Sequence, residues 1–322
     1  MSRLSDISAS PTLREFAQGA AQSAIMPVAD FLAPTVEVAM SVGRYKSYTE
    51  KNRFHIPDTL RTMGGRASEL RFEATDATFN CEPHALDYPV DNLEQLEAEG
   101  LENMLREGAT AVAEVAALAH EKAVIDAGLA IVGAGTGKTW NAAADPIADV
   151  DDAILSVIKA AKYGSLMGVG VLFGATAWKI FKNQEKVRGR FVVGNGGGPS
   201  TRSGQASANL GLAVPTEQSA TQMFIGSPDV RTSYMIYDAN PEGKAESISF
   251  LLDNTILIFA RKDAPSRRDP SFMKTFRLMN RFMVPGSYMR DDGRVEVAKF
   301  DWSEDVKVTN SAACVRLNIS AA

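Results

Sequence analysis

The segment most suggestive of chemistry runs from Gly133 to Thr139, with the sequence Gly-Ala-Gly-Thr-Gly-Lys-Thr. It resembles a phosphate-binding loop, in which backbone N–H groups wrap a nucleotide phosphate and a lysine, here Lys138, reaches it. That motif needs a glycine five positions before Gly137, where this chain has Val132. The motif also follows a buried strand and opens a helix, whereas a long helical pattern precedes this segment. We favour a flexible connection here, with a nucleotide hydrolase that uses Lys138 as an alternative.

A second glycine pattern, Gly168-Val-Gly-Val-Leu-Phe-Gly174, approximates the fingerprint of dinucleotide-binding proteins. The third glycine arrives one residue late, and the glycines lie within an apolar strand pattern rather than after it. Small residues in a crowded buried strand explain this pattern better than a cofactor site.

Residues of metal-ligand type are present but scattered. Cys81 and His84 are close in sequence, yet no second Cys or His pair completes a tetrahedral site. Glu114, His120 and Glu121 share a helical segment that has no further histidine at helical spacing. A Ser-His-Asp or Cys-His set stays open on composition, but no nucleophile elbow or other pattern supports one. The sequence therefore predicts no metal site, no cofactor and no catalytic residue, and we expect that the protein is not an enzyme.

Composition sets the broad class. The chain has 322 residues, 45% hydrophobic and 23% charged, which is ordinary for a globular protein of about two domains. Its net charge of −5 argues against binding nucleic acid mainly through a basic surface, although local basic patches remain compatible with it. Two cysteines do not make a disulfide framework. The beginning of the chain lacks the apolar run of a secretory signal, and the uncharged stretch 163–178 is short and glycine-interrupted, so we expect a soluble intracellular protein without a membrane partner.

The first half of the chain reads as extended elements. Residues 1–41 resemble an arm, and 42–90 read as a long β-hairpin with a polar, charged tip and few apolar residues of its own. Asp91-Asn-Leu-Glu94 resembles a capping box, and an apolar stripe at helical spacing continues to Asp126. A continuous helix over this range would be roughly 54 Å long.

The second half alternates helices and strands. Asp145-Pro146 opens a helix, where the carboxylates of the 145–152 segment suit the helix N-terminus. Further helices are expected at 178–181 and 216–224, a flexible glycine-rich loop at 189–211, and a buried strand at 168–174. Later strands are expected at 232–237, 248–252, 255–260, 295–300, 306–309 and 314–319. The fold class is α+β, and the hairpin and long helix, which bury little by themselves, favour a self-assembling protein.

Several stretches, in this order, resemble the major capsid proteins of tailed bacteriophages. The segment 42–48 (Val-Gly-Arg-Tyr-Lys-Ser-Tyr) resembles the entry into that family's extended E-loop, and 79–90 resembles its exit into a spine helix. Trp140 with 144–150 (Ala-Asp-Pro-Ile-Ala-Asp-Val), 172–178 and 270–276 resemble later segments. The collinear order carries the resemblance, which covers the chain from about Phe31 to its end.

The resemblance implies the tailed-phage major capsid fold: an N-terminal arm, an extended β-hairpin E-loop, a long spine helix and a mixed α/β axial domain. The implied division is 1–41 arm, 42–90 E-loop, 91–144 P-domain with the spine helix, 145–285 A-domain, and 286–322 C-terminal strands returning to the P-domain. The E-loop of one subunit would lie over its neighbour. The implied inter-subunit contact residues are Lys51, Arg53, Arg61, Arg66, Glu69 and Arg71.

The implied function is a structural subunit that assembles through hexamers and pentamers into an icosahedral head around double-stranded phage DNA. Its implied partners are further copies of itself, a scaffolding protein, a portal and decoration proteins, with only weak contact to the DNA. Its location would be the virion, after assembly in the host cytoplasm. The alternative within the same fold is an encapsulin-like bacterial shell that encloses cargo enzymes.

Overall fold

The computed structural model describes residues 27–47, 60, 63, 65, 75–91, 101–161, 168–192, 215–240, 243–281, 284–291 and 293–321. The chain forms two compact units, each assembled from two stretches of sequence. The first unit comprises Met1–Ile131 and Lys262–Asn310, and the second comprises Val132–Arg261 and Ser311–Ala322.

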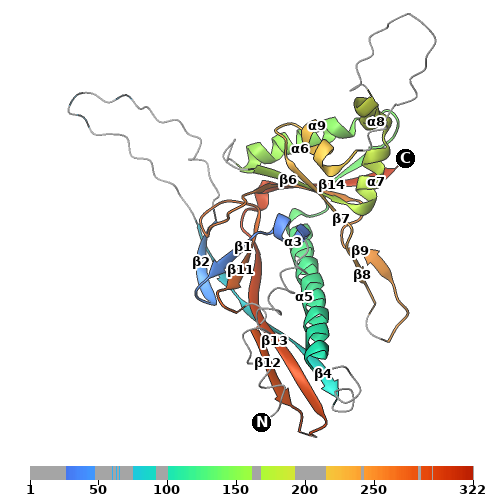
Figure 1. The fold of residues 1–322 in the computed structure, drawn as a ribbon. Helices are drawn as coiled ribbons and strands as arrows, with labels where there is room; N and C mark the ends of the chain where they lie inside the picture. Colours follow the sequence, from blue (N-terminus) through green and yellow to red (C-terminus); the bar gives the residue numbers. More distant parts are fainter. Residues whose placement is uncertain are drawn as a thin grey trace, which may run out of the picture. The chain divides into compact units, whose positions relative to one another are not determined.

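The first unit is a twisted β-sheet accompanied by one long helix (Figure 1). In chain order its elements are α3 (Pro27–Leu32), β1 (Thr35–Val38), β2 (Val42–Ser47), β3 (Thr75–Asn80), β4 (Glu82–Asp91), α5 (Leu101–Val132), β11 (Met273–Leu278), β12 (Val284–Met289) and β13 (Val295–Val308). The sheet has the order β1-β11-β13-β12, and β4 also pairs with β13. β2 and β3 form a separate antiparallel ribbon.

Strand β13 organises this sheet. The sequence predicted two strands here, at 295–300 and 306–309, whereas the structure has one continuous strand of 14 residues. The polar residues between the two apolar stretches do not interrupt it because they are paired inside the unit. Ser303 donates a hydrogen bond of 3.0 Å to the Cys81 carbonyl, and Glu304 accepts from Arg277 at 3.0 Å. Tertiary hydrogen bonds therefore keep this segment in a single strand, although its local sequence pattern favours a break.

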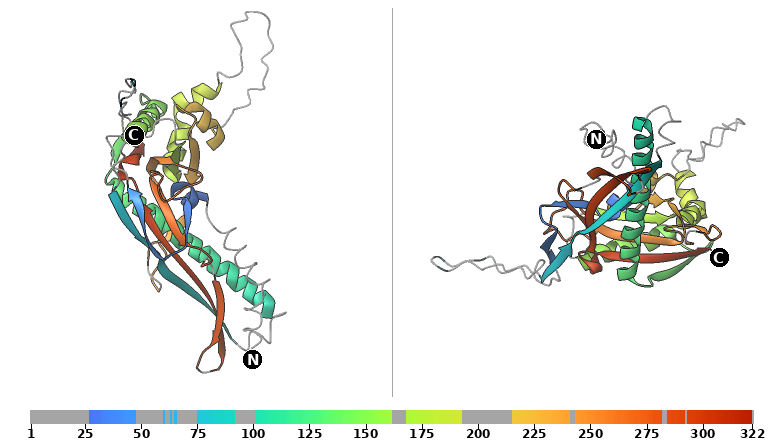
Figure 2. Two further views of the ribbon diagram at one scale, coloured as in Figure 1. Left: turned by 90° about the vertical axis from the view of Figure 1, so that its left-hand side faces the viewer. Right: turned by 90° about the horizontal axis from the view of Figure 1, so that it is seen from below.

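Helix α5 runs beside β4 and β13 in two perpendicular views (Figures 1 and 2). It extends to Val132, six residues beyond the predicted end at Asp126, and residues 92–100 of the predicted helix lie outside the described part. Gly128 sits inside the added turn, where a Cβ would lie only 3.3 Å from Met273 Sδ. Gly128 is thus a point of close packing between α5 and Met273 of β11. The helix is followed by Gly133, whose φ is +70°.

The second unit is a mixed five-stranded sheet of order β5-β14-β10-β6-β7 with helices packed on it. Its elements are β5 (Thr136–Trp140), α6 (Pro146–Ala161), β6 (Gly168–Gly174), α7 (Ala175–Asn183), α8 (Glu185–Val192), α9 (Glu217–Met223), β7 (Asp229–Ser233), β8 (Ile236–Asp238), β9 (Ile248–Phe250), β10 (Thr255–Arg261), the 3₁₀ turn η2 (Ser311–Ala313) and β14 (Cys314–Ala321). β8 and β9 form a two-stranded sheet of their own.

The core of the second unit follows the apolar patterns of the sequence. β6 and β10 are buried and pair antiparallel, with Val171 opposite Ile258. α6 begins at Pro146, as the Asp145-Pro146 pair predicts, and buries one apolar face that includes Val150 and Ile154. Phe173 contacts the ring of Phe181 on α7, with centroids 5.2 Å apart. The predicted helix start at Asp145-Pro146 and the predicted strand at 168–174 are therefore confirmed.

Three local expectations were wrong. The segment 133–139, expected to be a flexible connection, contains strand β5, which pairs in parallel with β14. The expected loop from residue 189 begins no earlier than 193, because α8 continues to Val192. The expected strand 232–237 is divided into β7 and β8, which belong to different sheets.

Candidate assembly surfaces

The β8–β9 hairpin carries a concentrated exposed apolar surface among the described residues. Ile236 lies directly opposite Phe250, and Asp238 lies opposite Ile248. Since alternate strand residues share a face, Ile236, Ile248 and Phe250 lie on one side of the ribbon. The exposed fractions are 60% for Tyr234, 48% for Ile236, 63% for Ile248 and 43% for Phe250.

Local hydrogen bonds hold the hairpin in register at its turn. The Asp238 carboxylate accepts from the backbone N–H groups of Asn240 at 3.0 Å and Ser247 at 2.9 Å. These two bonds lower the pKa of Asp238. The Ala239 N–H donates to the Ser247 carbonyl at 3.0 Å. An isolated two-stranded ribbon is marginally stable in water. An exposed apolar face on such a ribbon is therefore typical of a surface that a binding partner covers.

The β2–β3 ribbon has the opposite character, because its inner face is anchored in the first unit. Tyr45 and Phe79 are buried against Phe276 of β11, and the Phe79 and Phe276 rings stack with centroids 4.5 Å apart. On the outer side Lys46 forms an ion pair with Asp76, and this bond lowers the pKa of Asp76. Within the predicted hairpin range 42–90, residues 42–47 pair with 75–80, whereas residues 82–90 lie in β4, which pairs with β13 instead.

The predicted contact residues belong to the part of that hairpin beyond the ribbon. Lys51, Arg53, Arg61, Arg66, Glu69 and Arg71 all lie outside the described residues. Their role as inter-subunit contacts stays a prediction.

A buried polar network ties α5 to the sheet of the first unit. Nδ1 of His120 donates to Oε1 of Glu304 at 2.9 Å, and Nη2 of Arg277 donates to Oε2 of the same carboxylate at 3.0 Å. Burial alone would raise the pKa of Glu304, but the bonds and charges of His120 and Arg277 lower it to about 2. Glu304 is therefore an ionised carboxylate that is held between two cationic or donor groups.

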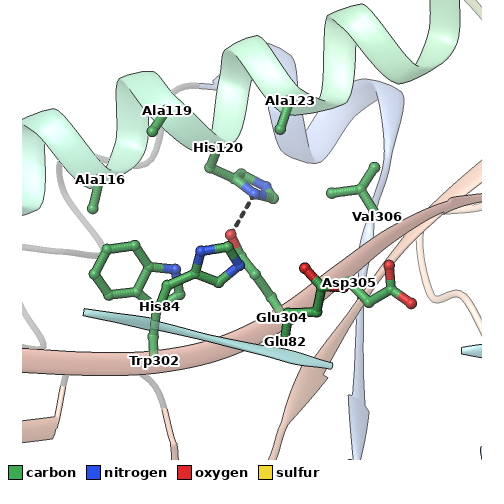
Figure 3. A pocket seen from close by; sticks show the side chains of 10 residues that line it. All are labelled: Glu82, His84, Ala116, Ala119, His120, Ala123, Trp302, Glu304, Asp305 and Val306. Atoms are coloured by element: carbon green, nitrogen blue, oxygen red, sulfur yellow. Dashed lines mark hydrogen bonds and ion pairs between the residues drawn. The ribbon is translucent and has the colours of Figure 1, made fainter. Parts of the chain in front are cut away.

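A cavity of about 220 Å³ lies next to this network (Figure 3). Ala116, Ala119 and Ala123 line it from α5, and the ring of Trp302 faces them from β13. His84 stacks on Trp302, with ring centroids 5.5 Å apart. The imidazoles of His84 and His120 are thus explained by packing and hydrogen bonding. Within the described ranges no group of three or more His, Cys, Asp or Glu side chains could hold a metal ion.

Glu121, the neighbour of His120 on α5, is fully buried. Burial raises the pKa of its carboxyl to about 7, against a smaller opposing effect of His120. Neither carboxyl oxygen has a hydrogen-bond partner among the described residues. Sequence reasoning placed Glu121 only as a weak ligand candidate, and the structure identifies it as an unusual buried acid.

The glycine-lysine segment has a geometry unlike that of a phosphate-binding loop. Lys138 lies in strand β5 rather than before a helix, and its Nζ is 2.8 Å from Oδ1 of Asp149. The other oxygen of Asp149 accepts from Nε1 of Trp140 at 3.0 Å. Asp149 therefore serves as a structural acceptor for two groups of β5, and the alternative of a nucleotide hydrolase through Lys138 finds no support in this arrangement.

Gly174, the last glycine of the 168–174 pattern, has a structural explanation as well. A Cβ at Gly174 would lie 2.1 Å from the backbone oxygen of Asp253. β6 must therefore end in a residue without a side chain, which supports the crowded-strand interpretation at Gly174, whereas a Cβ at Gly168 would make only an ordinary contact of 3.7 Å.

The β8–β9 hairpin was missed as a surface by sequence reasoning. Both strands carry alternating apolar residues, and the Asn240-Pro-Glu-Gly243 sequence between them is a turn signal. The pattern could have identified a hairpin, but only the structure shows that its apolar face is exposed.

No family model matches the chain. A major capsid protein of Pseudomonas phage JBD67 is 28% identical to it over 148 residues, which are 43% of this chain and 48% of that protein. The chain thus matches about half the length of this curated relative. None of the described helices is long and apolar enough to cross a membrane.

Solved structures match over nearly the whole chain. A phage-related protein from Bordetella bronchiseptica matches with a TM-score of 0.65 and 16% identity, covering 96% of each chain. The procapsid of satellite phage P4 matches with a TM-score of 0.52 and 12% identity over 98% of this chain and 93% of that chain. An encapsulin complex of Synechococcus elongatus matches with a TM-score of 0.51 and 13% identity, covering 91% of this chain and 88% of that chain. The predicted fold class and the resemblance to tailed-phage capsid proteins are confirmed.

Proposed function

We propose that this chain is the structural subunit of the icosahedral head of a tailed bacteriophage. It assembles through hexamers and pentamers of itself and encloses double-stranded DNA. The observation that carries the proposal is the exposed apolar face of the β8–β9 hairpin, on a chain with the capsid fold. The sequence similarity to a phage major capsid protein supports it.

The two ribbons suit a heterologous contact, in which different patches of identical subunits meet around a ring. The anchored β2–β3 ribbon offers a firm base from which residues 48–74 would reach a neighbour. In the second unit, the β8–β9 hairpin offers an apolar face for a neighbour to cover. Each contact can be weak, because many of them act together in a closed shell.

The finer assignments belong to the same proposal. The contact residues from Lys51 to Arg71 and the five-part division into arm, E-loop, P-domain, A-domain and C-terminal strands follow the resemblance to capsid proteins. A scaffolding protein, a portal and decoration proteins are proposed partners. Assembly would take place in the host cytoplasm and end in the virion, and the role is structural rather than enzymatic.

An encapsulin-like shell around cargo enzymes is the second candidate, because the chain matches an encapsulin about as well as it matches a procapsid. The two differ in particle size and content. Electron microscopy of the purified chain, alone and with the products of neighbouring genes, separates them. DNA-filled heads with a portal support the phage role, and small particles that capture an enzyme support the encapsulin role.

The carrying observation has its own test in the double variant Ile248→Ser/Phe250→Ser. We expect a folded subunit with an unchanged melting temperature that forms few or no shells. The matched control is Leu155→Ser, which replaces an exposed apolar residue on α6 and should assemble normally. Normal shells from the hairpin variant would remove the main support for the proposal, as would a compact monomer from the unaltered chain under every condition.

A further inference from the structure

Helices α7 and α8 carry a cluster of positive charge on an otherwise acidic chain. Between residues 179 and 190 the only acidic residue is Glu185. The basic residues there are Lys179, Lys182, Lys186, Arg188 and Arg190. This set, called here the α7–α8 basic cluster, contrasts with the net charge of −5 of the whole chain.

The charges of the cluster are largely free of intramolecular partners. Lys179, Lys186, Arg188 and Arg190 are exposed, and Lys182 is half-buried. Lys186 donates to the Ala143 carbonyl at 2.9 Å and lies 4.0 Å from an oxygen of Asp145. Among the described residues, no carboxylate lies within ion-pair distance of the other four. The cluster therefore projects an almost uncompensated positive field into solvent.

The cluster is mounted on rigid elements. On α7 the side chains of Trp178 and Phe181 are buried, and on α8 the side chain of Val187 is fully buried. Gln184 joins the two helices, and its side chain donates to the Trp140 carbonyl at 2.9 Å. The backbone positions that carry the five charges are thus fixed relative to one another, so that only the side chains lose conformational freedom when they bind a partner.

The composition of the surface decides the kind of partner. The cores of protein–protein interfaces are apolar and aromatic, with lysine depleted. The α7–α8 basic cluster is lysine-rich, and between Ala175 and Arg190 no large apolar side chain is exposed. The β8–β9 hairpin has the reverse composition. A row of phosphates, which is read by Lys and Arg without apolar anchors, fits the cluster better than a protein surface does.

We propose that the α7–α8 basic cluster binds the phosphate backbone of duplex DNA without reading its sequence. Only the identification of that DNA as the packaged genome rests on the proposed function. Binding is local, because the rest of the chain is acidic, and it weakens steeply with salt, because each neutralised phosphate releases counterions. The shell would then touch its contents at one defined face of the second unit.

The test uses the full unassembled chain and a fluorescein-labelled duplex of random sequence, with fluorescence anisotropy measured from 50 to 200 mM NaCl. The variant is Lys179→Gln/Arg188→Gln/Arg190→Gln. The control, Lys262→Gln/Arg268→Gln/Arg290→Gln, removes as many exposed charges elsewhere. We expect the cluster variant to bind at least about tenfold more weakly at 100 mM, with a salt slope shallower by up to about 2.7, since each phosphate contact contributes about 0.9. The control should change affinity less than about threefold.

Equal losses in the two variants would show that only net charge matters and would overturn the proposal. Absence of binding by the unaltered chain at 50 mM would do the same. Neither result depends on shell formation, so a chain that forms shells without binding DNA contradicts this inference alone, and a chain that binds DNA but never assembles contradicts the proposed function alone.

Discussion

Nδ1 of His120 lies 2.9 Å from Oε1 of Glu304, although 184 residues separate the two in the chain. Both side chains are buried, and the bond joins the long helix α5 to the central strand β13. Arg277 binds the second oxygen of the same carboxylate from β11. One carboxylate therefore connects three elements of the first unit.

Replacing Glu304 by Gln tests this connection. The substitution keeps the size of the side chain but removes the charge that faces His120 and Arg277 inside the unit. We expect the free energy of unfolding to fall by about 3 kcal/mol, because breaking a buried ion pair leaves its partner's charge poorly compensated. Urea denaturation of the unassembled chain measures it. The control is Asp301→Asn, which removes an exposed partner of Lys299 on the same strand and should change stability by less than about 1 kcal/mol. Similar losses in the two variants would contradict the role given to Glu304.

The buried carboxyl of Glu121 predicts that the free energy of unfolding falls as pH rises, whereas the contribution of Glu304 is lost as pH falls. Burial raises the pKa of Glu121 from the ordinary value of about 4.5 to about 7 in the folded chain, so between these two pH values the folded state holds a proton that the unfolded state has released. Stability should therefore decline as pH rises from 4.5 to 7, by roughly 3 kcal/mol for this group, and then level off. Glu304, whose pKa is lowered, loses its contribution only as pH falls from 4.5 toward 2. The two windows do not overlap.

The measurement compares the unfolding free energy of the unaltered chain with that of Glu121→Gln between pH 4.5 and 8. The difference reports on Glu121, because it is the only ionisable group that the two proteins do not share. The variant should gain stability relative to the unaltered chain as pH rises. Glu114→Gln, on the exposed side of α5, should show no such trend. Parallel curves for Glu121→Gln and the unaltered chain would mean that Glu121 is not a buried acid.

Neither the His120–Glu304 bond nor the burial of Glu121 could be predicted from the sequence. The helical stripe identifies the buried side of α5, but nothing in it indicates that His120 meets a carboxylate of a distant strand. The sequence does predict elements whose signals are local: α6 begins at the Asp145-Pro146 cap, and β6 matches the apolar run 168–174. Strand β5 could not be predicted, because Thr136–Trp140 has little apolar character and becomes a strand through its pairing with β14.

Gly174→Ala tests the crowded end of β6. A methyl group there would lie 2.1 Å from the Asp253 oxygen, which is backbone and cannot move aside cheaply. We expect a loss of several kcal/mol or an insoluble chain, since the strand pairs on both sides in the core of the second unit. Gly189→Ala on α8 is the matched control. A Cβ at Gly189 meets no atom within 4 Å, and alanine should stabilise the helix by about 0.5–1 kcal/mol. Thermal melting and soluble yield measure both, and equal behaviour of the two variants would contradict the crowding argument.

Lys138→Ala separates a structural from a nucleotide-binding role for the glycine-lysine segment. The Lys138–Asp149 pair is partly exposed, so its loss should lower stability by no more than about 1 kcal/mol. Trp140 keeps its own bond to Asp149, and β5 keeps its pairing with β14. We therefore expect the variant to fold and to form shells like the unaltered chain, with the same background rate of ATP hydrolysis. Electron microscopy and a phosphate-release assay provide the two measurements. Substantial ATP turnover by the unaltered chain that disappears in Lys138→Ala would show that this segment binds nucleotide, despite the strand that contains Lys138.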